Sequence, residues 1–211
     1  MHCPSAFRET RLPVLHELMA RHPLGTLITA GSGGLIANLV PFSLHSGGEH
    51  GLLRAHLARN NQQLEALREG AEVLVVFQGP QGYVTPSWYP SKAEHGKAVP
   101  TWNYCMVQVR GQAQVIEQAG WLREQLEQLT ANHENQRSQP WQVSDAPADY
   151  ISAQLRGIVG VEIPIAAIEG KWKMSQNQSP ANRQGVIDGL SAEPEGSALL
   201  AMMQAEHSQA G

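Results

Sequence analysis

The sequence predicts a mainly β fold of the α+β class, an antiparallel barrel with peripheral helices and a C-terminal helical tail. Strand-like runs cluster in the first half of the chain, and helical runs lie between and after them. No regular alternation of strands and helices supports a doubly wound parallel sheet. Closure of the strands into a barrel would remove exposed sheet edges. These observations favour an antiparallel barrel.

The first half of the chain contains most of the predicted strands. A helix is expected over residues 10–22, where Leu12, Leu15, Leu18 and Met19 share a face. Strands are expected over 24–30, 35–45 and 51–57, followed by a short helix over 60–70. The apolar run 73–77 predicts a strand covered on both faces, and residues 78–82 predict a turn after it.

The second half begins with a loop over residues 86–100, which holds three prolines. Loops of this length inside a compact domain are often functional. The clearest strand follows, since Val107, Val109, Gly111, Ala113 and Val115 alternate with Gln108, Arg110, Gln112 and Gln114. The sequence then predicts a helix over 118–131, a loop over 138–150 and a short helix. One last strand follows, on which Val159, Val161, Ile163 and Ile165 share a face.

Residues from 179 onward predict a polar helical tail. We therefore expect one domain over residues 1–178 and a tail over 179–211 that packs on the same domain.

The composition indicates a soluble globular protein, with 42% hydrophobic and 16% charged residues. The net charge of −4 does not mark the whole chain as a nucleic-acid binder. Cys3 and Cys105 are the only cysteines, which argues against a zinc site or a disulfide framework and predicts a cytoplasmic location. No apolar run approaches the roughly 20 residues needed to cross a bilayer.

The familiar sequence motifs for nucleotide binding and hydrolysis are missing. The chain has no G-x-G-x-x-G, no P-loop, no G-x-S-x-G and no H-E-x-x-H. We therefore predict no catalytic residue and no metal ligand.

Three polar stretches remain as candidate sites: RAHLARNNQQL (54–64), VPTWNY (99–104) and KWKMSQNQS (171–179). The first leads into a helix N-terminus, which suits an anion such as phosphate, although this stretch alone favours an ordinary helix cap with solvated neighbours. The third mixes lysines and amides that suit a heteroaromatic ring and a phosphate, or a plain polar exit loop. The second supplies aromatic and amide groups for a flat ligand, or an aromatic plug that closes a barrel end.

Five segments in the same order resemble one family. These segments are MHCPSAF, FQGPQGYVTPSWYP, VPTWNY, LTANHENQ before Trp141, and RGIVGVEIPIAAIEGKWKMSQN. They are similar to the PaiB family of FMN-binding negative transcriptional regulators. The resemblance implies the FMN-binding split β-barrel fold and a homodimer with FMN at the subunit interface. It also implies a repressor.

The resemblance implies a set of flavin-binding residues. AHLARNN resembles the family's G-H-M-A-x-x-N-P-Q, which implicates His56, Ala58 and Asn61 near the flavin phosphate, while Arg59 falls on a variable position with a suitable charge. KMSQN resembles K-L-S-Q-N and PTWNY is shared. The residues implicated by these two motifs are Lys173, Ser175, Gln176, Asn177, Trp102 and Asn103.

Two positions depart from the family pattern. Leu39 replaces the histidine of A-T-H-L-P, and Gln62 stands where the family has proline. If that histidine touches flavin in the family, the contact is lost here.

Two functions stay open at this point. The resemblance implies a regulator, which would act on DNA directly or through a regulatory protein partner. The sequence contains no helix-turn-helix with a basic recognition helix. The alternative is a flavin-dependent oxidoreductase or flavin reductase that uses NAD(P)H, in which the cofactor itself carries the hydride chemistry. Fold alone cannot decide between the two.

Overall fold

The structure is a computed structural model that describes residues 1–193 and 196–209. The chain divides into two compact units. Unit 1 comprises Met1–Leu15, Gln78–Val107 and the segment from Glu169 onward, and unit 2 comprises His16–Phe77 and Gln108–Ile168. The predicted domain boundary after residue 178 stays a prediction, and residues 194–195 and 210–211 of the predicted tail lie outside the described residues.

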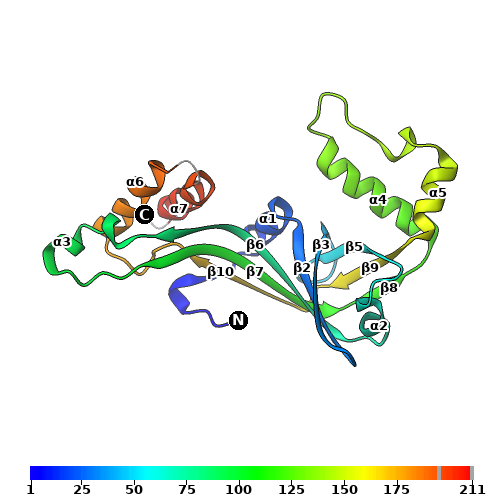
Figure 1. The fold of residues 1–211 in the computed structure, drawn as a ribbon, viewed down its shortest axis with the longest axis horizontal. Helices are drawn as coiled ribbons and strands as arrows, with labels where there is room; N and C mark the ends of the chain where they lie inside the picture. The colour runs from blue at the N-terminus through cyan, green and yellow to red at the C-terminus, as the bar shows by residue number, and fades with distance from the viewer. Residues whose placement is uncertain (194–195, 210–211) are drawn as a thin grey trace. The chain divides into compact units, whose positions relative to one another are not determined.

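Unit 1 is a four-stranded sheet with helices on one face. Its strand order is β1 (Arg8–Glu9), β10 (Ala167–Lys173), β7 (Thr101–Gln112) and β6 (Glu72–Val84), with the first part of β6 and the end of β7 belonging to unit 2. Helices α6 (Pro180–Ser191) and α7 (Ser197–Gln209) lie over β6 and β7 (Figure 1). The short elements η1 (Ser5–Phe7), η2 (Pro86–Trp88) and α3 (Ser91–His95) lie in the connections, and α1 (Leu12–Arg21) begins in this unit.

Unit 2 contains two antiparallel sheets. In the first, β6 pairs with β2 (Leu24–Gly31), which pairs with β3 (Gly34–Pro41). In the second, the order is β4 (Ser43–His45), β5 (Leu52–Ala58), β9 (Ile158–Pro164) and β8 (Gln114–Ile116). Helix α2 (Gln63–Arg68) follows β5.

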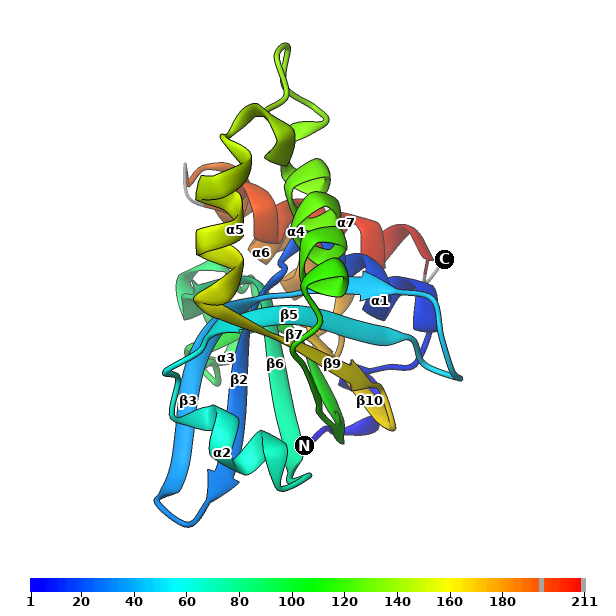
Figure 2. The ribbon, with the colours of Figure 1, turned by 90° about the vertical axis from the view of Figure 1, so that its right-hand side faces the viewer.

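A pair of helices completes unit 2. Helices α4 (Ala119–Glu134) and α5 (Ala148–Arg156) lie side by side, joined through η3 (Val143–Asp145) (Figure 2). Leu122, Val143, Ile151 and Leu155 form a buried apolar cluster between them. Apolar burial of this kind holds two amphipathic helices together.

Two glycines are required by the strand geometry. Gly34 has φ +96° directly after the turn that joins β2 to β3, and glycine adopts this backbone region without a steric penalty. A Cβ on Gly111 would collide with the Pro164 carbonyl oxygen. The close approach of these two strands therefore depends on glycine at position 111.

The predicted α+β class, antiparallel strands and C-terminal helices are confirmed. Each sheet has an open strand order with two end strands, so in the described part of the chain the sheets do not close into one barrel. None of the helices of that part is both long and apolar enough to cross a bilayer.

Four sequence predictions need correction. The strand expected over 35–45 is divided into β3 and β4, and the strand expected over 107–115 is divided into β7 and β8. The expected turn over 78–82 lies inside β6, and the expected single last strand is two strands, β9 and β10. The buried positions along β6 change from odd numbers (Val73, Val75, Phe77) to an even number (Val84). The stretch reads as a turn because Gly79, Pro80 and Gly82 are residue types typical of turns.

Candidate functional site

The sheet of unit 1 leaves one face open. Asn103, Cys105 and Trp172 are buried, and the residues that alternate with them along β7 and β10 point to the opposite side. We call this opposite side the open face of unit 1. Its members are Arg8, Tyr83, Trp102, Tyr104, Met106, Glu169, Lys171 and Lys173, of which Glu169 pairs with the Met1 amino group.

Two aromatic rings stand exposed on this open face. Trp102 is 53% exposed and Tyr83 is 49% exposed. Their ring centroids lie 6.1 Å apart at an interplanar angle of 73°, an edge-to-face pair. A planar ligand would find a large aromatic surface here.

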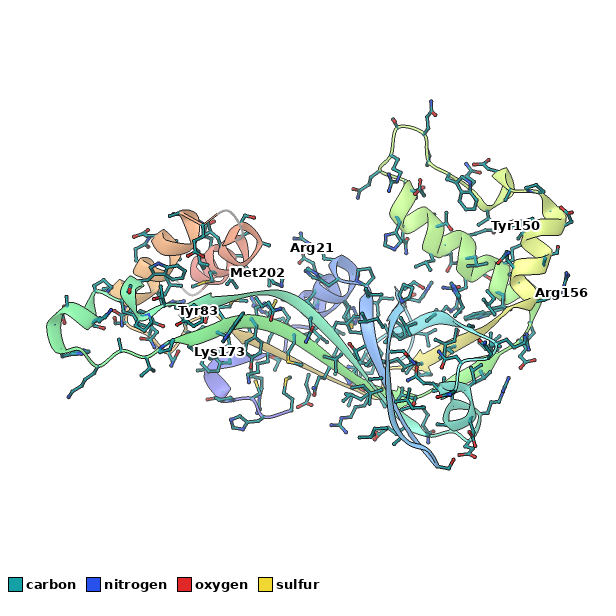
Figure 3. The ribbon with its side chains drawn as sticks, viewed as in Figure 1. Arg21, Tyr83, Tyr150, Arg156, Lys173 and Met202 are labelled. Carbon is teal, nitrogen blue, oxygen red and sulfur yellow. The ribbon has the colours of Figure 1, made fainter. Side chains whose placement is uncertain are left out.

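Lys173 lies beside this aromatic pair (Figure 3). Its Nζ donates to the Trp102 carbonyl oxygen at 2.6 Å and to Thr101 Oγ1. Burial, together with the neighbouring Lys171 ammonium, lowers the pKa of Lys173 from its ordinary value. Since an ammonium has three N–H groups, one donor stays available for a ligand.

The neighbouring strand positions add two further cations. Lys171 Nζ lies 5.2 Å from the centroid of the Tyr104 ring and donates to the His2 carbonyl oxygen at 3.1 Å. Arg8 is exposed and is the direct strand partner of Lys171. The open face of unit 1 therefore combines aromatic area with three positive charges.

Asn103 and Ser175 meet on the helix-covered side of the same sheet. Both are buried, and Asn103 Nδ2 donates to Ser175 Oγ at 2.9 Å and lies 3.4 Å from Met203 Sδ. Ser175 has φ +63°, an uncommon conformation for a residue other than glycine. The pair fixes the turn after β10 against β7.

Gln176 and Asn177 occupy the same turn. Gln176 accepts from the Met174 backbone N–H at 2.7 Å and donates to the Trp172 carbonyl oxygen at 2.6 Å, whereas Asn177 is exposed. Of the six predicted site residues of unit 1, only Trp102 and Lys173 lie on the open face.

The other four predicted site residues lie in unit 2, where local contacts engage three of their side chains. His56 Nδ1 donates to Gln125 Oε1 at 2.9 Å. Asn61 Oδ1 accepts from the Gln63 backbone N–H at 2.9 Å, which is a helix-capping contact before α2. Ala58 is exposed at the end of β5.

Arg59 is the most heavily bonded residue of this segment. Its Nε donates to the Arg156 carbonyl oxygen at 2.9 Å and its Nη2 to the Ile158 carbonyl oxygen at 3.2 Å. Its Nη1 lies 3.3 Å from Glu117, a carboxylate that also pairs with Arg68 at 2.9 Å. These two arginines lower the pKa of Glu117, so it stays ionised and offsets part of the Arg59 charge.

Unit 2 also has an open sheet face, formed by β2 and β3. Leu24, Leu35 and Leu39 are 54%, 79% and 65% exposed. Ile28 and Ala37 are direct strand partners on the same side, which also holds Thr26 and Ala30. We call these seven residues the open face of unit 2. Leu39, which departs from the family histidine, enlarges this apolar surface.

Sequence reasoning missed Arg8 and Tyr83 as candidate binding residues, and it placed Tyr104 and Lys171 in candidate stretches without selecting them individually. The alternation of Lys171 and Lys173 around buried Trp172 was a usable signal, because residues two apart on a strand share a face. Arg8 carries no local signal, since only the pairing of β1 with β10 brings it beside Lys171.

Comparison with known families and structures identifies relatives over most of the chain. Residues 1–167 match the family model described as "Putative FMN-binding domain". An uncharacterised protein of Emericella nidulans is 36% identical over 226 residues, with 90% of each chain covered. The "Protease synthase and sporulation protein PAI 2" of Bacillus subtilis is 30% identical over 193 residues, covering 92% of this chain and 90% of its own.

Solved structures support the fold alone, because their sequence identities are low. The FAD and heme binding protein from Mycobacterium smegmatis has a TM-score of 0.59 at 20% identity, covering 79% of this chain and 73% of its own. The conserved hypothetical protein Rv2991 from Mycobacterium tuberculosis has a TM-score of 0.58 at 13% identity, covering 85% and 94%. Together with the family model and the Bacillus relative, they lead to one conclusion: the chain belongs to the PaiB family of proteins built on this FMN-binding domain.

Proposed function

We propose that the chain is a flavin-binding transcriptional regulator of the PaiB type, which binds FMN at a homodimer interface and acts as a repressor. The family model supports the flavin, and the name of the Bacillus relative, which refers to protease synthesis and sporulation, supports a regulatory role. When bound, FMN would supply redox chemistry of its own, whereas the protein would supply binding and orientation.

The open face of unit 1 is the observation that carries the flavin proposal. An isoalloxazine ring is flat and aromatic, and its phosphate is anionic. Trp102 and Tyr83 offer exposed rings for stacking, and the Lys173 ammonium lies next to them. Stacking on an aromatic side chain and a charge-assisted bond to phosphate are both favourable contacts for such a ligand.

The remaining predicted site residues stand as proposals with different expected roles. Asn103, Ser175 and Gln176 would act by shaping the turn that carries Lys173, because their polar groups already bond within unit 1. His56, Ala58, Arg59, Asn61 and Asn177 remain candidates for direct contact. For Arg59 the Glu117 carboxylate reduces the charge that a phosphate would meet.

A homodimer is supported by the open face of unit 2. Exposed contiguous apolar surface marks an interaction site in a globular protein. Because Leu24, Leu35 and Leu39 lie on one side of β2 and β3, a second copy of the same chain could bury them in a symmetric contact.

The regulatory partner is either DNA or a regulatory protein. With a net charge of −4, DNA contact would depend on a local cationic surface and would weaken as salt concentration rises. The cytoplasmic location expected from the cysteine usage stays a prediction.

The flavin proposal is tested by mass spectrometry of a heat extract from the purified protein, followed by titration of the flavin-free protein. FMN in the extract and tight binding of added FMN are the expected results. An extract with FAD instead of FMN, or a protein that binds neither, would refute it. Anaerobic mixing with NADH or NADPH then separates the two functions, because rapid bleaching of the flavin band would favour the oxidoreductase.

A further inference from the structure

We propose that Arg8 and Lys171 form a phosphate-binding pair on the open face of unit 1, for a ligand whose planar ring stacks on Trp102 and Tyr83. The ligand class is a heteroaromatic ring joined by a short chain to a phosphate monoester. That this ligand is FMN rests on the proposed function. Arg8 lies outside the segments that resemble the family, and Lys171 lies in one of them but is not among the residues that the resemblance implicated.

Strand pairing brings the two cations together. Arg8 and Lys171 are direct partners in the antiparallel pair of β1 and β10, and the next pair is Glu9 with Gly170. Directly opposed residues of an antiparallel pair share a face, with Cβ atoms about 4.5–5.5 Å apart. Glu9 is buried, so Arg8 projects to the other side, together with Lys171.

Two like charges at opposed positions are unfavourable in the absence of a counter-ion. Glu169, the nearest acidic residue along β10, is paired with the Met1 amino group at 3.1 Å. The acceptors found for Lys171 and Lys173 are neutral: the His2 carbonyl oxygen, the Trp102 carbonyl oxygen and Thr101 Oγ1. Within residues 1–193 and 196–209, no carboxylate forms an ion pair with Arg8, Lys171 or Lys173.

A bound anion would therefore supply the missing counter-charge. A phosphate monoester is close to a dianion at neutral pH, and it accepts bidentate hydrogen bonds from a guanidinium group. Arg8 suits that geometry because it is exposed and its side chain is free to turn toward a ligand. The Tyr104 ring beneath Lys171 holds that ammonium in place.

The spacing fits a ligand with a ring at one end and a phosphate at the other. Trp102 lies on β7, Lys171 on β10 and Arg8 on β1, which are successive strands of the sheet. Neighbouring strands are about 4.8 Å apart, so the backbone of Arg8 lies roughly 10 Å across the sheet from β7. The flexible side chains of Arg8 and Lys171 shorten that separation, and the five-carbon ribityl chain of FMN can span it.

The test compares ligands with and without phosphate. FMN and riboflavin are titrated by fluorescence against wild type, Arg8→Gln, Lys171→Gln and Lys171→Arg, with Lys97→Gln as the matched control at an exposed lysine of unit 1. We expect each Gln variant at Arg8 and Lys171 to weaken FMN at least tenfold and to leave riboflavin within about twofold of wild type. Lys171→Arg and Lys97→Gln should bind FMN like wild type. Trp102→Ala should weaken both flavins, because stacking does not involve the phosphate.

Melting curves without ligand identify any variant that fails to fold, and the remaining Gln variant then carries the test. The inference is overturned if both Gln variants bind FMN as wild type does, or if they lose FMN and riboflavin equally. AMP against adenosine and pyridoxal phosphate against pyridoxal form a second arm. If wild type binds neither flavin, phosphate-dependent binding of either compound supports the pair and refutes only the flavin proposal. Absence of any phosphate-dependent binding overturns the pair itself.

Discussion

The open face of unit 1 carries aromatic rings and three cations, whereas the open face of unit 2 carries three exposed leucines with Ile28 and Ala37. Both are faces of antiparallel sheets, so the chemistry of their side chains, and not the backbone architecture, distinguishes them. Aliphatic surface is best covered by another protein surface, while rings beside unpaired cations suit a flat anion. We therefore propose the open face of unit 2 for protein assembly and the open face of unit 1 for ligand binding.

Substitutions on the open face of unit 2 should give the largest effect. The double variant Leu35→Glu/Leu39→Glu would place two charges inside the proposed dimer contact. Leaving an uncompensated buried charge costs about 3–5 kcal/mol. We expect dimer dissociation to be favoured at least a hundredfold, with a monomer mass in sedimentation equilibrium.

Gln112→Glu, at an exposed polar position at the end of β7, is the matched control and should leave the dimer intact. A double variant that stays dimeric would show that a second copy does not use this face.

The second prediction sharpens the contrast between the two sides of β7. Asn103→Ala would leave Ser175 Oγ buried without its partner, at a cost of about 1–3 kcal/mol. Trp102→Ala removes a half-exposed ring and should cost about 1 kcal/mol or less. Urea unfolding of the ligand-free variants measures both.

The two variants should have the reverse order of effects on FMN affinity. Trp102→Ala should weaken FMN strongly although it barely changes stability, whereas Asn103→Ala should act mainly through stability. Equal stability losses for the two variants would mean that the sides of β7 are not as different as their burial indicates.

The smallest expected effect is a dependence of FMN affinity on pH. Burial and Lys171 lower the pKa of Lys173 in the free protein. A bound phosphate favours the charged ammonium and therefore raises this pKa, so FMN binding takes up a proton in the window between the two values. FMN affinity should fall, by less than about tenfold, as pH rises through that window.

Lys171→Gln removes the like charge and should move the pH dependence to higher pH. Riboflavin, titrated over the same range, corrects for ionisation of the flavin ring. If the affinities of FMN and riboflavin depended on pH in the same way, Lys173 would not be the group that causes the pH dependence.

The sequence predicted the elements of this fold better than their boundaries and pairings. The alternation along residues 107–115 located part of β7 and β8, and apolar periodicity located α1 and α4. The turn expected over residues 78–82 was wrong because Gly79, Pro80 and Gly82, which are typical of turns, lie inside β6. The division of the last strand into β9 and β10 was missed because the apolar alternation of the predicted strand continues to Ile165, beyond the end of β9 at Pro164.

For the candidate site, the sequence selected the right segments more reliably than the right side chains. KWKMSQN and PTWNY both border the open face of unit 1, yet Asn103 and Ser175 turn to its covered side. Strand alternation explains why Asn103 lies on the covered side, because Asn103 directly follows Trp102 and successive strand residues point to opposite faces. The left-handed conformation of Ser175 and the pairing of Arg8 with Lys171 depend on the tertiary fold, which local sequence patterns do not encode.

The most direct test of the contrast between the two faces is a titration of FMN and riboflavin against wild type and Lys173→Ala, with the mass of each protein measured in parallel. A charge-assisted bond is worth about 1.5–3 kcal/mol. We therefore expect Lys173→Ala to bind FMN roughly tenfold to a hundredfold more weakly, to bind riboflavin as wild type does and to remain a dimer. Equal losses for the two flavins, or conversion to a monomer, would contradict the assignment of ligand binding to the open face of unit 1.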